Sequence, residues 1–300
     1  MPETEITFMS GPFRLMGAVD VPDGIRPGER RPAFIVLHGF GGSMKSSSLA
    51  PVAALLHELG YITLRFDRRG CGRSEGDPGY LICLEHVEDI RNAISVLERR
   101  PDVDSERIAI IGSSFGGALS IYTAAIDKRV AAVISSSGWG NGERKFRGQH
   151  PTPEAWTKFT AMLEDGRKHR ERTGKSLMVP RFDIVPIPEH LQGELKNKKK
   201  QGSLEFFAAE TAQSMYDFKA EEVIGQIAPR PVLLMHAAKD SVTPTEQSVE
   251  MFKRAGQPTE LHLFADADHF MLGTGNTRIQ NVVKDWLAKY FPARATIAAE

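Results

Sequence analysis

The segment Gly112-Ser113-Ser114-Phe115-Gly116 combines residue types that can expose a nucleophilic serine on a tight turn. It fits the pattern G-x-S-x-G, follows a β-rich run at 107–111 and precedes a helical pattern at 118–126. In such a turn the serine hydroxyl stands clear of the sheet. Glycines two positions before and after the serine let the strand and helix backbones approach closely. This frame selects Ser114 over Ser113 and puts it at a helix N-terminus, where the dipole favours developing negative charge. We therefore predict that Ser114 is a nucleophile; a glycine-rich turn without catalysis is the alternative.

A serine hydroxyl is a weak nucleophile at neutral pH and needs a base within hydrogen-bond reach. Of the nine histidines, His269 lies between the last predicted strand, 260–264, and the last predicted helix, 276–290. That loop opens at the carboxyl ends of the strands, where the turn at Ser114 also lies. His269 is the predicted base. The others are assigned to helix faces (His57, His86), to the segment 139–205 (His150, His169, His190) or, for His236, to a satisfied position in the core.

A carboxylate is expected to orient the histidine, and Asp240 follows the buried strand that ends near Met235. There it would hold the imidazole tautomer and stabilise the imidazolium. A helix N-cap is the alternative role for Asp240. Asp266 and Asp268 are rivals, but they are so close to His269 in sequence that reaching its ring nitrogen is sterically harder.

Two main-chain donors are expected for an oxyanion. The glycine-rich turn His38-Gly39-Phe40-Gly41-Gly42 follows the strand 33–37, and we predict the N–H groups of Phe40 and Phe115 as the donors. A phosphate-binding turn is the alternative, but the Lys-Ser/Thr pair of a P-loop is missing.

The elements that must position these residues alternate between short apolar runs and helical patterns, which indicates βαβ units and a parallel sheet. The predicted strands are 5–9, 13–21, 33–37, 61–66, 107–111, 130–135, 231–236 and 260–264, and the predicted helices are 47–59, 84–99, 118–126 and 276–290.

Residues 139–205 interrupt this rhythm and are predicted to form a cap, leaving 1–138 and 206–300 as the core domain. Two helices, 154–172 and 203–217, are expected on either side of the proline-rich stretch 180–188. A run of this length without regular structure needs a function or a structure of its own. Its aromatic residues are expected to line an acyl or alcohol pocket, although more of them pack than touch substrate: Trp139, Trp156, Phe159, Phe182 and Phe206. The basic run 196–200 is interpreted as a solvated surface turn, with a patch that binds phosphate or nucleic acid as the alternative.

The order Ser114, Asp240, His269 resembles that of the α/β-hydrolase superfamily. The segment Asp67-Arg68-Arg69-Gly70-Cys71-Gly72-Arg73-Ser74 looks like the D-x-R-G-x-G-x-S turn that follows the fourth strand in that superfamily. The layout is similar to the dienelactone-hydrolase-like and feruloyl-esterase-like branches, in which a helical insertion before the acid-bearing strand shapes the pocket. The resemblance implies an α/β-hydrolase fold, with a mostly parallel central sheet flanked by helices and a helical cap. Dienelactone hydrolases have cysteine at the nucleophile position, so Ser114 argues against dienelactone as the substrate.

Composition excludes several other classes. Lys+Arg and Asp+Glu both number 38, unlike the basic excess of a nucleic-acid binder. The N-terminus lacks a secretory signal pattern, and no apolar run is long enough to span a membrane. Two cysteines, Cys71 and Cys83, are expected as free thiols, which fits a reducing cytoplasm. No metal or organic cofactor is expected, since no histidine, cysteine and carboxylate cluster has ligand spacing.

These observations predict a serine hydrolase that cleaves a carboxylic ester of small or medium size, including aromatic ones, through an acyl-enzyme. An acyltransferase and an amidase or peptidase would use the same three residues. A ligand receptor on a hydrolase scaffold is the alternative from a different class. The expected partner is a small-molecule ester, without nucleic acid or membrane.

Overall fold

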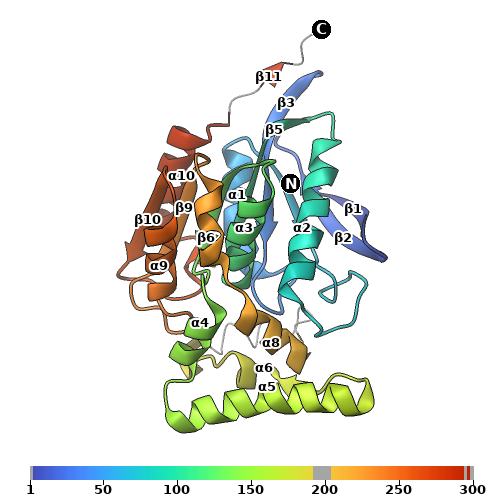
Figure 1. The fold of residues 1–300 in the computed structure, drawn as a ribbon. Helices are drawn as coiled ribbons and strands as arrows, with labels where there is room; N and C mark the ends of the chain where they lie inside the picture. Colours follow the sequence, from blue (N-terminus) through green and yellow to red (C-terminus); the bar gives the residue numbers. More distant parts are fainter. Residues whose placement is uncertain (1–2, 192–203, 294–295, 298–300) are drawn as a thin grey trace.

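A computed structural model describes residues 3–191, 204–293 and 296–297. Its centre is a twisted sheet with the strand order β1-β2-β4-β3-β5-β6-β9-β10 (Figure 1). The strands are β1 (Glu3–Ser10), β2 (Phe13–Asp20), β3 (Glu29–Leu37), β4 (Ile62–Phe66), β5 (Val103–Ser113), β6 (Val130–Ser136), β9 (Val232–Ala237) and β10 (Thr259–Phe264). The six strands from β4 to β10 run parallel, while β1 and β2 add an antiparallel edge and β11 (Thr296–Ile297) pairs antiparallel with β3.

Alternate side chains of the central strands enter two separate cores, because successive residues of a strand point to opposite faces. In β3, Phe34 and Val36 pack with α1 (Ala50–Glu58) and α10 (Thr277–Tyr290). Ile35 and Leu37 pack on the other face with α2 (Cys83–Glu98) and α3 (Phe115–Ile126). The prediction of a mostly parallel sheet covered by helices on both faces is confirmed.

The segment between β6 and β9 gathers at one end of the sheet (Figure 1). Its elements are α4 (Gly142–Gln149), α5 (Pro153–Thr173), β7 (Met178–Pro180), α6 (Arg181–Ile184), β8 (Phe206–Ala208) and α8 (Ala209–Asp217). The long helix α5 is capped at its N-terminus by Thr152, whose hydroxyl accepts the Ala155 N–H. At its C-terminus it is capped by Gly174, which has a positive φ of 71°.

Two details of this segment differ from the prediction. Helix α4 was not predicted, and the helix expected over 203–217 begins only at Ala209. The preceding residues, Phe206–Ala208, form β8 because they pair antiparallel with β7 and bury Phe207 completely. The basic run 196–200 lies outside the described residues. Among the helices that the structure describes, none has the length and apolar character needed to cross a membrane.

Candidate active site

Ser114 occupies a strained turn between β5 and α3. Its φ of 56° and ψ of −117° lie where residues with a side chain are disfavoured, and its N–H donates to the Ser136 carbonyl at 2.8 Å. A Cβ on Gly112 would lie 2.3 Å from the Gly116 carbonyl oxygen, and one on Gly116 would lie 2.7 Å from that of His38. The strand and helix backbones therefore approach so closely that only glycine fits at these two positions, as the sequence indicates.

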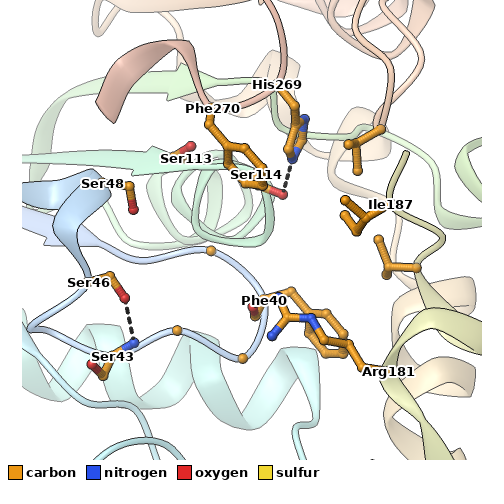
Figure 2. Close-up of a pocket in the computed structure, with 15 residues that line it drawn as sticks. Phe40, Ser43, Ser46, Ser48, Ser113, Ser114, Arg181, Ile187, His269 and Phe270 are labelled. Atoms are coloured by element: carbon orange, nitrogen blue, oxygen red, sulfur yellow. Dashed lines mark hydrogen bonds between the residues drawn. The ribbon is translucent and has the colours of Figure 1, made fainter. Parts of the chain in front are cut away.

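The side chains of Ser114 and His269 meet at the carboxyl end of the sheet, although 155 residues separate them. Nε2 of His269 lies 2.9 Å from the Ser114 hydroxyl, as Figure 2 shows. The His269 side chain is 2% exposed, because it is buried in the loop between β10 and α10. This distance is within the range in which an imidazole can take a proton from a hydroxyl.

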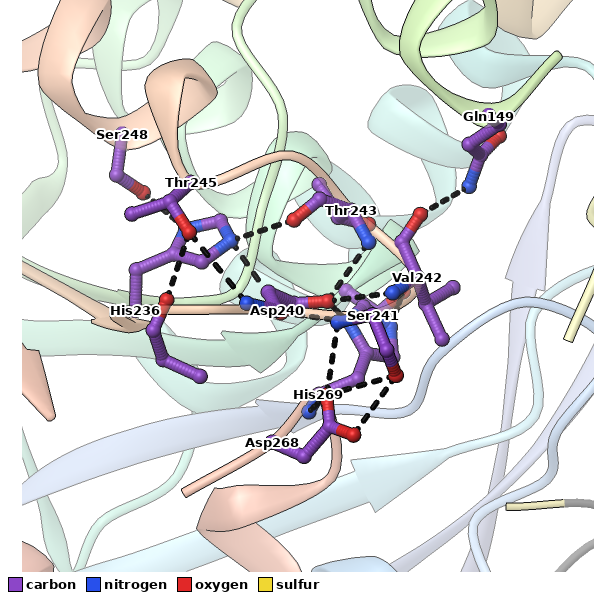
Figure 3. Close-up of polar contacts among 12 residues, drawn as sticks. Gln149, His236, Asp240, Ser241, Val242, Thr243, Thr245, Ser248, Asp268 and His269 are labelled. Atoms are coloured by element: carbon purple, nitrogen blue, oxygen red, sulfur yellow. Dashed lines mark hydrogen bonds and ion pairs between the residues drawn. The ribbon is translucent and has the colours of Figure 1, made fainter. Parts of the chain in front are cut away.

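Asp240 lies on the other side of the His269 ring, and its side chain is fully buried. Its two carboxylate oxygens are 3.0 and 2.9 Å from Nδ1 of His269, and Oδ1 also accepts the N–H groups of Val242 and Thr243 at 2.9 and 2.7 Å (Figure 3). Burial raises the pKa of the Asp240 carboxyl, but the charge of His269 and the hydrogen bonds from His236 and His269 outweigh it. The pKa is therefore held well below its usual range, and Asp240 is an anion at neutral pH.

The two rival carboxylates do not reach the His269 ring. Asp268 accepts the main-chain N–H of His269 at 2.7 Å and the Ser241 N–H and hydroxyl at 2.8 and 2.9 Å, all through Oδ1 (Figure 3). Its other oxygen lies 3.1 Å from Nε2 of His190. Asp266 has a side chain that is 91% exposed and faces Arg278. Asp268 therefore supports the loop that carries His269, and Asp240 alone of the three contacts the imidazole.

The turn that follows β3 passes beside the serine. A Cβ on Gly39 would be 3.6 Å from Cβ of Ser114. The Gly39 carbonyl accepts from the buried guanidinium of Arg68 at 3.3 Å, and Nη2 of Arg68 also lies 3.0 Å from Nδ1 of His38. Burial and the Arg68 charge hold the pKa of His38 well below its ordinary value, so His38 is neutral. These contacts fix the turn in place, while the oxyanion role of the Phe40 and Phe115 N–H groups stays a prediction.

A narrow cavity opens at Ser114 and His269. The cavity volume, measured as the space open to the centre of a water molecule, is about 50 Å³. The cavity is lined by the turn at 39–42 with Ser43, Ser46 and Ser48, and by Arg181, Val185 and Ile187 from the segment between β6 and β9. Figure 2 shows the Arg181 side chain beside Phe40 of that turn. Val242 and Phe270 complete the lining near His269. Within the described part of the chain, no group of three or more histidine, cysteine, aspartate or glutamate side chains is placed to hold a metal ion.

None of the five aromatic residues proposed for the pocket lines this cavity. Trp139 is buried and stacks on Phe115 with 5.5 Å between ring centroids, and Phe159 is buried between Phe146 and His150. Trp156 packs on Phe159. Phe182 and Phe206 are 45% and 53% exposed. The first three are packed against neighbouring rings, and the last two are exposed and do not line the cavity.

The side chains that do line the cavity from the segment between β6 and β9 come from the proline-rich stretch. Sequence reasoning missed Arg181, Val185 and Ile187, and it missed Phe270 directly after the base. The available signal was the stretch itself, because prolines at 180, 186 and 188 prevent a long helix there, and only the one-turn helix α6 forms between the first two.

Arg69 of the Asp67–Ser74 turn contacts residues outside the cavity. Its guanidinium pairs with buried Asp89 at 2.7 Å and donates to Ser10, and its main-chain N–H also reaches Asp89. Asp67 in turn accepts the N–H groups of Met44 and Arg73. These contacts tie the turn to α2 and to the start of the sheet, and Arg69 does not line the cavity.

Comparison with known proteins agrees with this fold. A model of the alpha/beta hydrolase family matches residues 34–277. The chain belongs to this family. It is 30% identical over 274 residues to the polyketide transferase ATR5 of Stachybotrys chlorohalonatus, covering 86% of this chain and 88% of that protein. It is 25% identical to the thiohydrolase aneE of Aspergillus aculeatus, covering 82% and 80%.

Two solved structures share the architecture. The alpha/beta hydrolase GrgF of Penicillium aligns over 97% of this chain and 99% of that chain with a TM-score of 0.79 and 23% identity. Est1E of Butyrivibrio proteoclasticus, solved with ferulic acid bound, aligns over 95% and 98% with a TM-score of 0.67 and 19% identity. The expected resemblance to the superfamily, with neighbours of the feruloyl-esterase type, is therefore confirmed at the level of fold.

Proposed function

We propose that this chain is a serine hydrolase that cleaves carboxylic esters or thioesters by acyl transfer, with Ser114, His269 and Asp240 as its catalytic triad. The observation that carries the proposal is the continuous contact from the Ser114 hydroxyl to His269 at 2.9 Å and from His269 to Asp240 at 2.9 Å. Ser114 also has the strained backbone that lifts a nucleophile out of its sheet.

The mechanism follows from these contacts. Asp240 accepts the Nδ1–H of His269, which leaves Nε2 free to take the Ser114 proton as the serine oxygen attacks the carbonyl carbon. The N–H groups of Phe40 and Phe115 would stabilise the oxyanion of the tetrahedral intermediate. His269 returns its proton to the departing alkoxide or thiolate, and the acyl group stays on Ser114. Water then attacks the acyl-enzyme and gives a proton to His269, which passes it to the departing Ser114 oxygen as the acid is released.

The segment 139–205 would act as a cap on this reaction. Phe207, just beyond it, stacks on Phe40 with 4.4 Å between ring centroids, and Arg181 donates to the Phe40 carbonyl at 2.8 Å. These two contacts join the cap side of the cavity to the turn that would hold the oxyanion.

The test is hydrolysis of p-nitrophenyl acetate, p-nitrophenyl butyrate and a butyryl thioester, with a p-nitroanilide as the amide arm. We expect ester and thioester turnover, and a loss of at least about a thousandfold in Ser114→Ala. Mass spectrometry after treatment with a fluorophosphonate should place one adduct on Ser114. Ser176→Ala, a hydroxyl deletion elsewhere in the cap, is the matched control. Undiminished turnover in Ser114→Ala would overturn the proposal.

An acyltransferase is the second candidate, favoured by the narrow cavity and by the relative named as a polyketide transferase. In that case an alcohol or amine would replace water in the second step. Product analysis with and without small alcohols separates the two: hydrolysis gives the free acid alone, whereas transfer gives the new ester in excess of the acid.

A further inference from the structure

Arg181 is the first residue of α6, and its side chain extends into the cavity beside Ser114 and His269 (Figure 2). Nη2 donates to the Phe40 carbonyl at 2.8 Å, and the guanidinium carbon lies 5.3 Å above the Phe40 ring. Nη1 lies over the glycine turn, because a Cβ on Gly41 would be only 2.9 Å from it. The guanidinium is therefore held in one place by the turn next to the nucleophile.

Within the described part of the chain, no carboxylate neutralises this guanidinium. Three other partly buried arginines have a carboxylate partner: Arg69 with Asp89, Arg129 with Asp127 and Arg144 with Glu221. Arg68 and Arg230 contact carbonyls or a ring nitrogen instead, but neither lines the cavity beside Ser114. For Arg181 the structure gives no ion pair with any residue that it describes, and its Nε is buried without a hydrogen-bond partner. Burial lowers the pKa of Arg181 to about 10, so it still carries its charge at neutral pH. A charge withdrawn from water without a partner is unfavourable, which indicates that a further group completes the site.

None of the described residues that line the cavity would repel an anion. Its other lining residues are glycines, serine hydroxyls, apolar side chains and His269, with no aspartate or glutamate among them. The planar fork of a guanidinium matches a carboxylate, which accepts two of its N–H groups side by side.

We infer that Arg181 binds a carboxylate of the substrate, so that the acyl group transferred to Ser114 comes from a dicarboxylic acid and carries a second, free acid group. This inference rests on the acyl-transfer function proposed above and adds the substrate class to it. The contact of Nη2 with Phe40 uses one of the five N–H donors of the guanidinium. The substrate carboxylate would take donors on the side facing the cavity.

The experiment compares each anionic ester with a neutral ester of the same chain length. Mono-p-nitrophenyl adipate is paired with p-nitrophenyl hexanoate, and mono-p-nitrophenyl pimelate with p-nitrophenyl heptanoate, after subtraction of each enzyme-free rate. In the unmodified protein we expect kcat/KM to be at least tenfold higher for the anionic member of one pair, with the difference mainly in KM. Free adipate should compete with that substrate, and inorganic phosphate should not.

The variants test Arg181 through this ratio, because damage to the triad lowers both members of a pair equally and leaves the ratio unchanged. Arg181→Gln keeps an N–H donor for the Phe40 carbonyl but removes the charge, and the ratio should fall to about one. Arg181→Lys should restore part of it. Arg167→Gln removes an exposed arginine of α5 that pairs with Glu164 and Glu171, and it should keep the original ratio.

The outcomes separate this inference from the proposed function. Turnover of the neutral esters without preference for the anionic ones, or an unchanged ratio in Arg181→Gln, would overturn the role of Arg181 while leaving the hydrolase standing. Stronger competition by phosphate than by adipate would overturn the carboxylate. Absence of Ser114-dependent turnover with every ester would instead overturn the proposed function.

Discussion

The imidazole of His236 lies 3.3 Å from Oδ2 of Asp240, with both side chains fully buried (Figure 3). His236 is also held by Ser248 at 2.7 Å from Nδ1 and by the Thr243 carbonyl at 3.0 Å from Nε2. Asp240 is thus placed between two histidines, one of which faces Ser114. The core histidine expected from the sequence at this position is satisfied, and one of its contacts is the carboxylate assigned to the triad.

The first prediction concerns the pH dependence of this contact. A lowered pKa means that Asp240 stabilises the folded state at pH values above the ordinary carboxyl pKa of about 4, and that this stabilisation is lost as the pH falls. Replacing His236 by asparagine removes a hydrogen bond to the carboxylate. The free energy of unfolding at pH 7 should fall by about 1–3 kcal/mol.

Urea denaturation at several pH values checks this prediction. The gap between the variant and the unmodified protein should stay constant from neutral pH down to about pH 4 and should narrow as the pH falls further. His169→Asn, on the cap helix α5, is the control and should unfold with the unmodified protein. A gap that widens on acidification would contradict the assigned direction of the Asp240 pKa.

The second prediction separates the two aspartates near the base. Asp240→Asn should lower kcat/KM for p-nitrophenyl butyrate by about 10³–10⁴, because an amide cannot hold the same imidazole tautomer or stabilise the imidazolium. Asp268→Asn alters only contacts to Ser241, His190 and a main-chain N–H, so its loss should stay below about tenfold. Equal losses in the two variants would mean that the carboxylate contact with the ring has no special role.

The sequence was most informative where backbone geometry restricts residue type. Only glycine fits at 112 and 116, so the turn that carries Ser114 could be recognised from the five residues 112–116. The parallel strands were equally visible, because both of their faces are buried and their apolar runs are continuous. His269 and Asp240 followed from the ends of those strands.

The cavity wall could not be predicted in the same way. A large aromatic side chain is as valuable in packing as in a pocket, and Trp139 and Phe159 are used by neighbouring rings. The position of Arg181 depends on how the proline-rich stretch folds back over the turn at 39–42 and on the pairing of β7 with β8. Those are long-range contacts that local sequence patterns do not encode.

The third prediction concerns the two free thiols. Cys71 and Cys83 are buried, and burial raises the pKa of both to about 12. Because the thiolate is the reactive form, neither should react with dithionitrobenzoate at pH 8 in the folded protein. Two thiols per chain should react at once in urea. Rapid reaction of either cysteine without denaturant would show that its segment opens in the folded state.

The fourth prediction isolates the strain at the nucleophile. Ser114→Ala and Ser114→Gly both remove the hydroxyl and its contact with His269, and they differ only in the Cβ atom. At a φ of 56° that atom is unfavourable, whereas glycine adopts the conformation freely. The glycine variant should therefore be more stable than the alanine variant by about 1 kcal/mol in urea denaturation, although both are inactive. The neighbouring Ser113 is the last residue of β5 and has no positive φ. At this position the order of stability of the two variants should reverse, and Ser113→Gly should be less stable than Ser113→Ala by about 0.5–1 kcal/mol. Such a reversal between adjacent serines would mean that the fold stores backbone strain specifically at the residue whose hydroxyl faces His269.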